Sequence, residues 1–265
     1  MKLGVSLFSF GGDIQTGAIS VDAAIRYCAE LGCEGVEIIG EQHLRNWPQT
    51  SIDELEHIRN LCSSLNLEIF CFSIYMNSLA HFDREATFEE YVEMIKNGVS
   101  TCKYLGAKIL RPAYYGVPVQ KLIDLVEVCL PILEENQIIW GVELHAPFPP
   151  SYYMEALEKI NSPWFRLVPD FSCWQTAGAA GHFQANDVST LIPLLKYTVH
   201  CHGKAHVFDE NGEEPNTPYR DILGILKENN FKGSVVAEQE GWIFNYKPTK
   251  EAAKTHYALL ERYGR

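Results

Sequence analysis

Short apolar runs alternate with longer amphipathic stretches along the whole chain. The apolar runs have the length of buried strands, and the stretches between them repeat apolar residues at helical spacing. The expected strands are Lys2–Leu7, Gly35–Ile39, Glu68–Ser73, Ala107–Arg111, the stretch Ile138–Pro147, Phe165–Asp170, Tyr197–His202 and Ser234–Glu238. The expected helices are Ser20–Leu31, Ser51–Leu65, Thr87–Leu105, Val119–Asn136, Tyr152–Ile160, Val188–Leu195, Tyr219–Asn229 and Thr249–Tyr263. This succession of strand–helix units predicts an α/β protein that forms a single (β/α)₈ TIM barrel over residues 1–265.

A doubly wound open sheet is the alternative fold. It would require a glycine-rich phosphate-binding turn after the first strand. The stretch Phe8–Gly12 lacks the GxGxxG spacing of such a turn. No linker or change of composition divides the chain, so the pattern favours the barrel as one domain.

Composition and charge limit the classes of partner. The chain has 46% hydrophobic and 21% charged residues, which is typical of a globular protein with a full core. Its formal net charge of −12 disfavours binding to nucleic acid or to an anionic membrane surface.

The eight cysteines include no Cys-x-x-Cys pair, and most lie in apolar patterns, which indicates reduced, buried thiols and a cytoplasmic location. No apolar run reaches the roughly 20 residues that a membrane span needs.

Four successive strands end in side chains that bind metals. Glu143, Asp170, the His200–Cys201–His202 segment and Glu238 close the fifth to eighth strands. Each has an ordinary explanation when taken alone, such as a helix-cap acid, a rim carboxylate or a core histidine. In a barrel, however, the carboxyl ends of the strands meet on one rim, and active sites lie there. Three carboxylates and one imidazole suit one divalent ion, with Mn²⁺ preferred and Mg²⁺, Co²⁺ or Zn²⁺ as alternatives.

The segments around these residues resemble the xylose-isomerase-like TIM barrels, which include sugar isomerases, ketose 3-epimerases and endonuclease IV. The segments are Val142–His145, Pro169–Phe171, His202–Lys204 and Ala237–Glu240. The resemblance implies a metal ion held by Glu143, Asp170, His202 and Glu238. It favours His202 over His200 because the His-x-Lys spacing to Lys204 matches the family's seventh strand.

Two departures from the family pattern narrow the expected activity. Cys173 stands where many relatives have a histidine three residues after the aspartate. The third and fourth strands end near Tyr75 and Arg111. They lack the histidines that the three-metal site of endonuclease IV needs, so DNA-repair activity is not expected. The Glu143-x-His145 pair, in contrast, resembles the α-subunits of bacterial C-glycoside-cleaving enzymes, in which the histidine is an acid or base.

The resemblance implies chemistry on a sugar or a related polyhydroxy ketone. A divalent ion would chelate adjacent carbonyl and hydroxyl oxygens and stabilise an enediolate. The relatives suggest that Glu143 and Glu238 move the proton, with His145 as a further catalytic candidate. The expected activity is therefore a metal-dependent isomerase or epimerase. A metal-dependent lyase, including a dehydratase or a C-glycoside-cleaving subunit, and a non-catalytic barrel subunit are the alternatives.

Aromatic and basic residues near the strand ends are candidates for contact with a carbohydrate. Those expected to bind substrate are Phe8, Tyr75, Arg111, Tyr114, Trp174 and Lys204. For Arg111 and Lys204, a salt bridge with the rim acids is an equal alternative. The expected partner is a small carbohydrate, with no nucleic acid and no membrane, and assembly into a homo-oligomer is left open.

Overall fold

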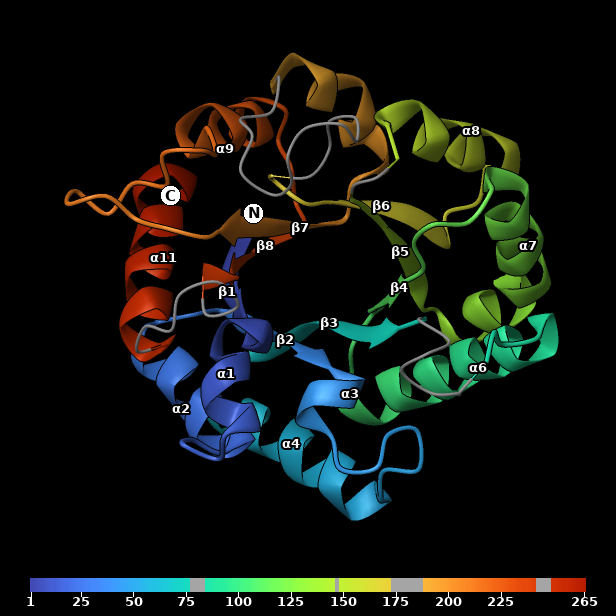
Figure 1. Ribbon diagram of the computed structural model, residues 1–265, viewed down its shortest axis with the longest axis horizontal. Helices are drawn as coiled ribbons and strands as arrows, with labels where there is room; N and C mark the ends of the chain where they lie inside the picture. Colours follow the sequence, from blue (N-terminus) through green and yellow to red (C-terminus); the bar gives the residue numbers. More distant parts are fainter. Residues whose placement is uncertain (77–83, 146–147, 173–187, 242–248) are drawn as a thin grey trace.

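The computed structural model shows a parallel barrel surrounded by helices (Figure 1). The structure describes residues 1–76, 84–145, 148–172, 188–241 and 249–265. The strands are β1 Lys2–Ser6, β2 Gly35–Ile39, β3 Glu68–Tyr75, β4 Ile109–Ala113, β5 Ile139–Leu144, β6 Phe165–Pro169, β7 His200–Ala205 and β8 Ser234–Gln239. They form one sheet in the order β6-β5-β4-β3-β2-β1-β8-β7. Isolated bridges, including one between Asp170 and His202, join β6 to β7, so the predicted (β/α)₈ barrel is confirmed.

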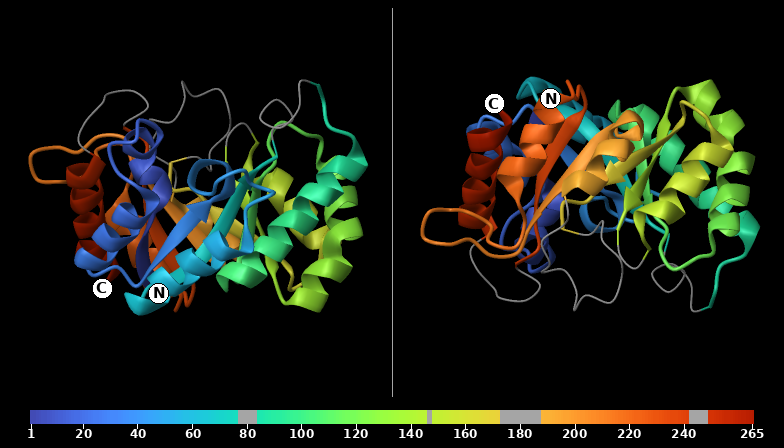
Figure 2. Two further views of the ribbon diagram at one scale, coloured as in Figure 1. Left: turned by 90° about the horizontal axis from the view of Figure 1, so that it is seen from below. Right: turned by 90° about the horizontal axis from the view of Figure 1, so that it is seen from above.

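The helices form a ring outside the strands (Figure 1). They are η1 Leu7–Phe10, α1 Gly11–Gln15, α2 Val21–Glu30, α3 Gly40–His43, α4 Ile52–Ser64, α6 Phe88–Leu105, α7 Val119–Asn136, α8 Pro150–Ile160, η2 Val188–Tyr197, α9 Tyr219–Glu228 and α11 Thr249–Gly264. Both chain termini lie at the end of the barrel where the strands begin (Figure 2). None of the helices in the described ranges is long and apolar enough to cross a membrane.

One strand differs from its sequence prediction in a way that affects the site. The seventh strand was expected at Tyr197–His202 but is observed at His200–Ala205. The 3-10 helix η2 continues through Tyr197, and the Thr198 hydroxyl donates a hydrogen bond to the Leu194 carbonyl at 3.1 Å. Lys204 therefore lies within β7, directly opposite Glu238 of β8. His200 and His202 lie at successive positions on the same face of the strand.

An aromatic ring fills part of the barrel interior at the end where the strands begin. The Phe70 ring lies so close to Gly4 and Gly35 that a Cβ atom on either glycine would be less than 3.0 Å from the ring. The two glycines therefore make room for this ring between β1, β2 and β3. Phe70 thus occupies the amino-terminal end of the barrel interior and separates it from the solvent.

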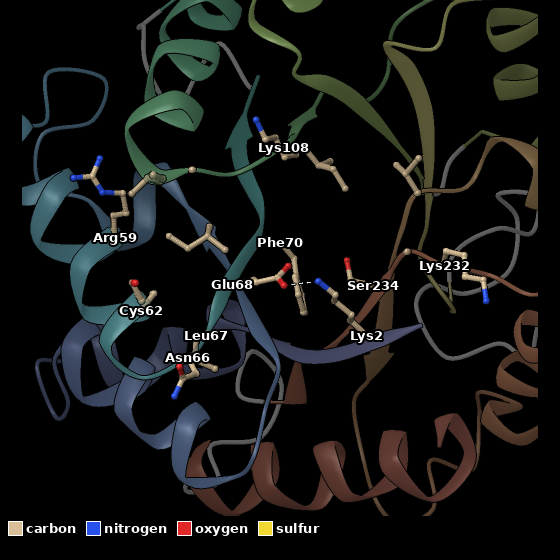
Figure 3. A pocket seen from close by; sticks show the side chains of 17 residues that line it. Lys2, Arg59, Cys62, Asn66, Leu67, Glu68, Phe70, Lys108, Lys232 and Ser234 are labelled. Atoms are coloured by element: carbon tan, nitrogen blue, oxygen red, sulfur yellow. Dashed lines mark hydrogen bonds and ion pairs between the residues drawn. The ribbon is translucent and has the colours of Figure 1, made fainter.

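A cavity of about 710 Å³ lies outside this end of the barrel (Figure 3). It is lined by the strand-start residues Lys2 and Ser234 and by Lys108 and Lys232, among others. The ion pair between Lys2 and Glu68 crosses it. Because these residues mark the starts of strands, the cavity is at the opposite end of the barrel from the predicted metal ligands.

A capping box begins α6, the helix that packs on β3 and β4. The Thr87 hydroxyl accepts a hydrogen bond from the Glu90 N–H at 3.2 Å, and the Glu90 carboxylate accepts one from the Thr87 N–H at 2.8 Å.

Thr87→Ala should lower the free energy of unfolding by about 1 kcal/mol, because a helix N–H loses its acceptor. Thr87→Ser should retain stability. Chemical denaturation of the three proteins measures the difference, and an alanine variant as stable as the parent would contradict this role.

Candidate metal centre

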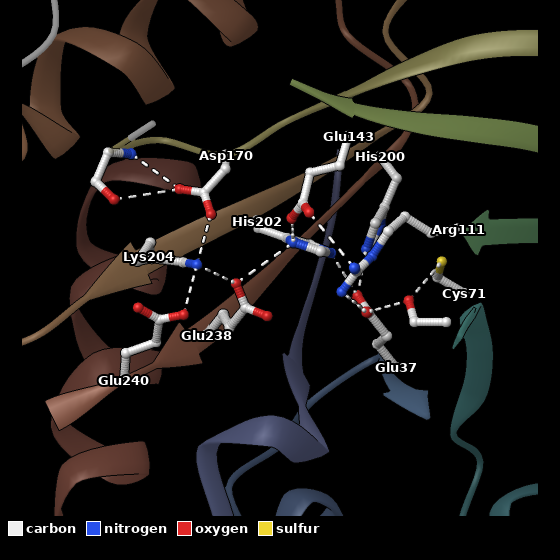
Figure 4. A network of polar contacts seen from close by, with 12 residues as sticks. Glu37, Cys71, Arg111, Glu143, Asp170, His200, His202, Lys204, Glu238 and Glu240 are labelled. Carbon is white, nitrogen blue, oxygen red and sulfur yellow. Dashed lines mark hydrogen bonds and ion pairs between the residues drawn. The ribbon is translucent and has the colours of Figure 1, made fainter. Parts of the chain in front are cut away.

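Four side chains predicted from the sequence converge inside the barrel near the carboxyl ends of the strands (Figure 4). They are Glu143 of β5, Asp170 after β6, His202 of β7 and Glu238 of β8. One ligand atom from each lies within 4.8 Å of those of the other three. None of the four residues is more than 3% exposed. Side chains far apart in the sequence therefore form one compact group of potential metal ligands.

The Asp170 carboxylate is oriented by the turn that follows β6. Its Oδ1 accepts hydrogen bonds from the backbone N–H and the hydroxyl of Ser172 at 3.0 and 3.3 Å. Its Oδ2 is buried and turned toward the other acids, 2.7 Å from Lys204 Nζ. An aspartate that hydrogen-bonds the backbone two residues later is typical of an Asx turn. One carboxylate oxygen is thus held in place while the other points into the site.

His202 presents one ring nitrogen to the acids. Its Nδ1 lies 2.5 Å from Glu143 Oε1 and 3.4 Å from Glu238 Oε2. Burial lowers the pKa of His202, but the surrounding carboxylates, Glu238 first among them, raise it well above its ordinary value. A proton on Nδ1 occupies the position in which a metal ion would bind this nitrogen.

The donor set fits a divalent cation. Five buried carboxyl groups face the two fixed cations Arg111 and Lys204, which leaves an excess of negative charge in a region shielded from water. Lys204 Nζ is shared among Asp170, Glu238 and Glu240 at 2.7–3.3 Å. Asp170 Oδ2 and Glu238 Oε2 nevertheless accept no directed hydrogen bond among the described residues. Inward-facing oxygens of this kind, with one imidazole, match Mn²⁺ or Mg²⁺.

The two glutamates have opposite protonation tendencies. Burial raises the pKa of Glu143, but Arg111 and His202 outweigh it and hold that pKa below its ordinary value. Burial also raises the pKa of Glu238. His202 and Lys204 lower it, but not enough to cancel this rise, to which Glu143 and Asp170 add. Paired carboxyl groups with different proton affinities are typical of acid–base sites.

His145 lies beside the four candidate ligands and is not part of their cluster among the described residues. Its ring centroid is 5.0 Å from that of Tyr115, whose hydroxyl donates a hydrogen bond to Glu143 Oε2. The Tyr153 hydroxyl holds the His145 backbone through its N–H and carbonyl at 3.2 and 2.9 Å. The His145 ring thus contacts Tyr115 and is close enough to help lower the pKa of Glu143. Its role as a second acid–base group stays a prediction.

Both basic residues predicted to contact substrate form ion pairs with acids of the site. Arg111 Nη1 lies 3.4 Å from Glu143 Oε2, and Nη2 lies 3.7 Å from Glu37 Oε1. Arg111 and Lys204 are each 3% exposed. The salt-bridge interpretation is therefore observed for both. Their contact with a substrate stays a prediction.

The predicted aromatic contacts have different surroundings. Phe8 is buried in η1. The Tyr75 hydroxyl accepts a hydrogen bond from Gln42 Nε2 at 2.8 Å. Burial raises the pKa of Tyr75, and Arg111 lowers it by less than burial raises it. Tyr114 packs on Tyr91 of α6, with ring centroids 5.0 Å apart. Trp174 lies outside the described residues. Binding of a carbohydrate by these side chains stays a prediction.

Glu37 of β2 was missed by the sequence analysis. It is completely buried, and its carboxylate contacts His200, His202, Ser73 and Arg111. Burial raises its pKa, but His202, His200 and Arg111 together hold that pKa well below its ordinary value. The only sequence signal was an acid in the middle of the apolar run Gly35–Ile39. Glu37, His200 and His202 also form a second group of metal-capable side chains.

The fold and site define a (β/α)₈ barrel with a candidate metal centre at the carboxyl ends of its strands. The family model of the xylose isomerase-like TIM barrel matches residues 25–263, and the chain belongs to this family. It is 25% identical to the 3'-dehydrocarminate deglycosidase alpha subunit of Microbacterium sp, over 92% of this chain and 89% of the relative. It is 24% identical to the C-glycoside deglycosidase alpha subunit of Arthrobacter globiformis, over 91% of this chain and 84% of that protein.

A solved structure supports the same fold. The 3-keto-D-glucoside 4-epimerase from E. coli superposes with a TM-score of 0.69 at 15% identity, covering 98% of this chain and 99% of that chain. At this level of identity the likeness concerns the fold alone. The match to the family model confirms the predicted family. The relatives found by sequence are deglycosidase alpha subunits, and the solved structures with the same fold include a sugar epimerase.

Removal of a single carboxylate charge should weaken metal binding. Asp170→Asn and Glu238→Gln retain shape but replace an anionic oxygen ligand by a neutral one. The protein prepared without metal, titrated with Mn²⁺, should bind one equivalent, and each variant should bind at least tenfold more weakly, on the order of 1.4 kcal/mol. Glu34→Gln, which changes an acid outside the cluster, is the control. Equal affinity in both site variants would exclude these residues as ligands.

Metal affinity should increase with pH. The pKa values of His202 and Glu238 are raised, so both groups take up protons, in competition with a metal ion, at a higher pH than free side chains would. As pH falls, these protons return and affinity drops, by up to about tenfold per pH unit for each proton released. Mn²⁺ titrations at three pH values, in buffers of different ionisation enthalpy, measure the slope and the number of protons released. A pH-independent affinity would contradict the competition.

Proposed function

We propose that this protein is a divalent-metal-dependent enzyme that isomerises or epimerises a keto sugar by removing a proton from the carbon next to the carbonyl group. The convergence of Glu143, Asp170, His202 and Glu238 on one point carries this proposal. Membership of the xylose isomerase-like family supports the same chemistry. A sugar with a ketone is the substrate class, since the E. coli epimerase in the comparison acts on a 3-keto-D-glucoside.

In such a reaction, different residues of the chain would bind the metal ion, move protons and stabilise negative charge. The four ligands would hold the cation, which supplies Lewis-acid stabilisation of the negative charge that develops on the substrate oxygen. Glu143, whose pKa is held low by its cationic neighbours, accepts the proton from carbon. The proton returns to the carbon skeleton from Glu143, or from Glu238 after this second glutamate has taken up a proton from the solvent. The positive charges of Arg111 and Lys204 also favour the anionic intermediate.

Cleavage of a C-glycoside is a second candidate. The specific observation in its favour is the pair of deglycosidase alpha subunits that match over more than nine-tenths of this chain. The first step is the same proton removal beside a sugar ketone. The electron pair then expels the group on the next carbon instead of returning to a proton, and an acid protonates that leaving group. His145, whose ring packs against the Tyr115 ring that hydrogen-bonds Glu143, would supply this proton.

Deuterium exchange separates the two outcomes. The Mn²⁺-loaded protein is incubated in D₂O with methyl 3-keto-glucoside and, separately, with a 3-keto C-glucoside, and products are followed by NMR. Isomerase or epimerase activity places deuterium beside the ketone of an intact sugar. Lyase activity releases the aglycone and leaves an unsaturated sugar. Absence of both exchange and cleavage on these and other keto sugars, with metal bound, would contradict the proposed class.

The expected binding partner differs between an isomerase or epimerase and a C-glycoside-cleaving lyase. A lyase of the deglycosidase type implies a small second subunit, because the matching relatives are alpha subunits. An isomerase or epimerase needs only the carbohydrate. Co-purification from the native source, followed by measurement of mass in solution, distinguishes a hetero-complex from a monomer or homo-oligomer. The cytoplasmic location and the absence of nucleic-acid and membrane partners stay predictions.

His145→Ala should lower kcat while retaining metal and fold. General acid–base groups contribute roughly 10²–10⁴-fold, so a loss of that size is expected on the true substrate. His57→Ala, which removes a half-exposed histidine of α4 paired with Asp22, is the matched control and should leave the rate unchanged. Steady-state kinetics and metal content of both variants provide the measurement. An undiminished rate for His145→Ala would assign the residue to packing against Tyr115.

A further inference from the structure

The histidine of the candidate metal centre is contacted from behind by a buried carboxylate. Glu37 Oε2 lies 2.8 Å from His202 Nε2, on the opposite side of the ring from Glu143 and Glu238 (Figure 4). Glu37 belongs to β2, whereas His202 belongs to β7, so this hydrogen bond crosses the barrel interior. The carboxylate is completely buried, and among the described residues it contacts the site through this ring and Arg111.

The partners of Glu37 determine where the imidazole protons lie. An ionised carboxylate can only accept hydrogen bonds. His202 Nε2 and His200 Nε2, 2.8 and 3.1 Å from the same oxygen, must therefore both carry protons and donate. His200 Nδ1 then accepts the hydrogen bond from the Ser234 hydroxyl at 2.7 Å. With Nε2 protonated, the neutral form of His202 has its lone pair on Nδ1, the nitrogen that faces the acids.

Three further contacts hold the Glu37 carboxylate in this position. The Ser73 hydroxyl donates to Oε1 at 2.6 Å, and Arg111 Nη2 lies 3.7 Å from the same oxygen. His200 occupies the side of Oε2 toward the start of β7. A buried carboxylate with this many donors is fixed in place, and it can then fix the ring that donates to it.

We propose that Glu37 is a positioning residue that fixes His202 as the Nε2–H tautomer with Nδ1 directed at the metal ion. This inference rests on the proposed metal site. Carboxylates that accept the second N–H of a metal-bound histidine orient the ring and increase its basicity. If Nδ1 carried the proton, that proton would point at Glu143 and would have to leave before a cation could bind.

A cation between Glu37, His200 and His202 is the competing explanation of the same cluster. A cation at this position would have to displace the protons through which both Nε2 atoms donate to Glu37 at 2.8 and 3.1 Å. This cluster also offers one carboxylate, which Arg111 approaches to 3.7 Å, so it has less negative charge for a cation than the three acids of the neighbouring site. The cluster therefore supports the neighbouring site instead of forming one.

Glu37→Gln tests the role through metal affinity. The amide retains the shape of the side chain, but it removes the charge and allows an N–H group to face the ring. The protein prepared without metal and titrated with Mn²⁺ should bind roughly 10–100-fold more weakly in this variant. Glu34→Gln is the matched control, because Glu34 lies just before β2, accepts a hydrogen bond from the Leu3 N–H at 2.9 Å and contacts neither histidine. Its affinity should equal that of the parent.

The tautomer itself can be observed without a variant. In the Cd²⁺-loaded parent protein labelled with ¹⁵N-histidine, His202 should show a protonated Nε2 and a metal-bound Nδ1. Cd²⁺ bound at Nε2, or Mn²⁺ affinity unchanged in Glu37→Gln, would overturn the inference. If Glu37→Gln does not fold, Ser73→Ala removes one hydrogen bond from Glu37 and should weaken Mn²⁺ binding by a smaller factor. A parent protein that binds neither ion would instead refute the proposed metal-dependent function.

Discussion

The concentration of buried negative charge inside the barrel is the constraint on which the rest of the site depends. Carboxylates at this depth are costly unless positive charge or hydrogen-bond donors meet them. Arg111 and Lys204 supply the fixed positive charge, and each is placed between two or more acids. The remaining excess explains why His202 has a raised pKa and why a divalent cation suits the centre. Charge balance thus links the ligands, the histidine and the basic residues in one electrostatic unit.

Polar and charged side chains of this electrostatic unit occupy part of the barrel interior that apolar side chains usually fill. TIM barrels are usually filled by layers of branched apolar side chains. Here Phe70 and the glycines beneath it fill the amino-terminal end, while Glu37, Ser73, Arg111 and His200 occupy positions nearer the site. Stability must then come mainly from the apolar layer between strands and helices, to which Trp140 and Leu110 contribute. The division leaves the strands rigid while their inward side chains serve chemistry.

The barrel and the four candidate ligands could be predicted from the sequence, because the alternating pattern indicates the strand ends and the family resemblance selects His202 among the histidines of β7. Acids at the ends of apolar runs face one rim whenever parallel strands close into a barrel. Glu37 could not be found in this way, because its hydrogen bonds to His200 and His202 join residues 163 and 165 positions apart. Periodicity shows that Glu37 faces one side of β2, but it does not show which side. The hydrogen bond from Tyr115 to Glu143 could not be predicted either, because Tyr115 lies in an irregular loop whose side chains follow no periodic direction.

The hydrogen bonds from Ser234 through His200 and Glu37 to His202 have a consequence for the two ends of the molecule. Ser234 lines the cavity at the amino-terminal end, whereas His202 faces the acids at the carboxyl end. Packed side chains inside the barrel separate its two ends. The hydrogen bonds from Ser234 to His202 nevertheless couple the two ends electrostatically. A substitution on the face remote from the acids can therefore alter the imidazole through hydrogen bonds without moving a strand. A change of residue at Ser234 is therefore separated from the candidate metal ligand His202 by three hydrogen bonds.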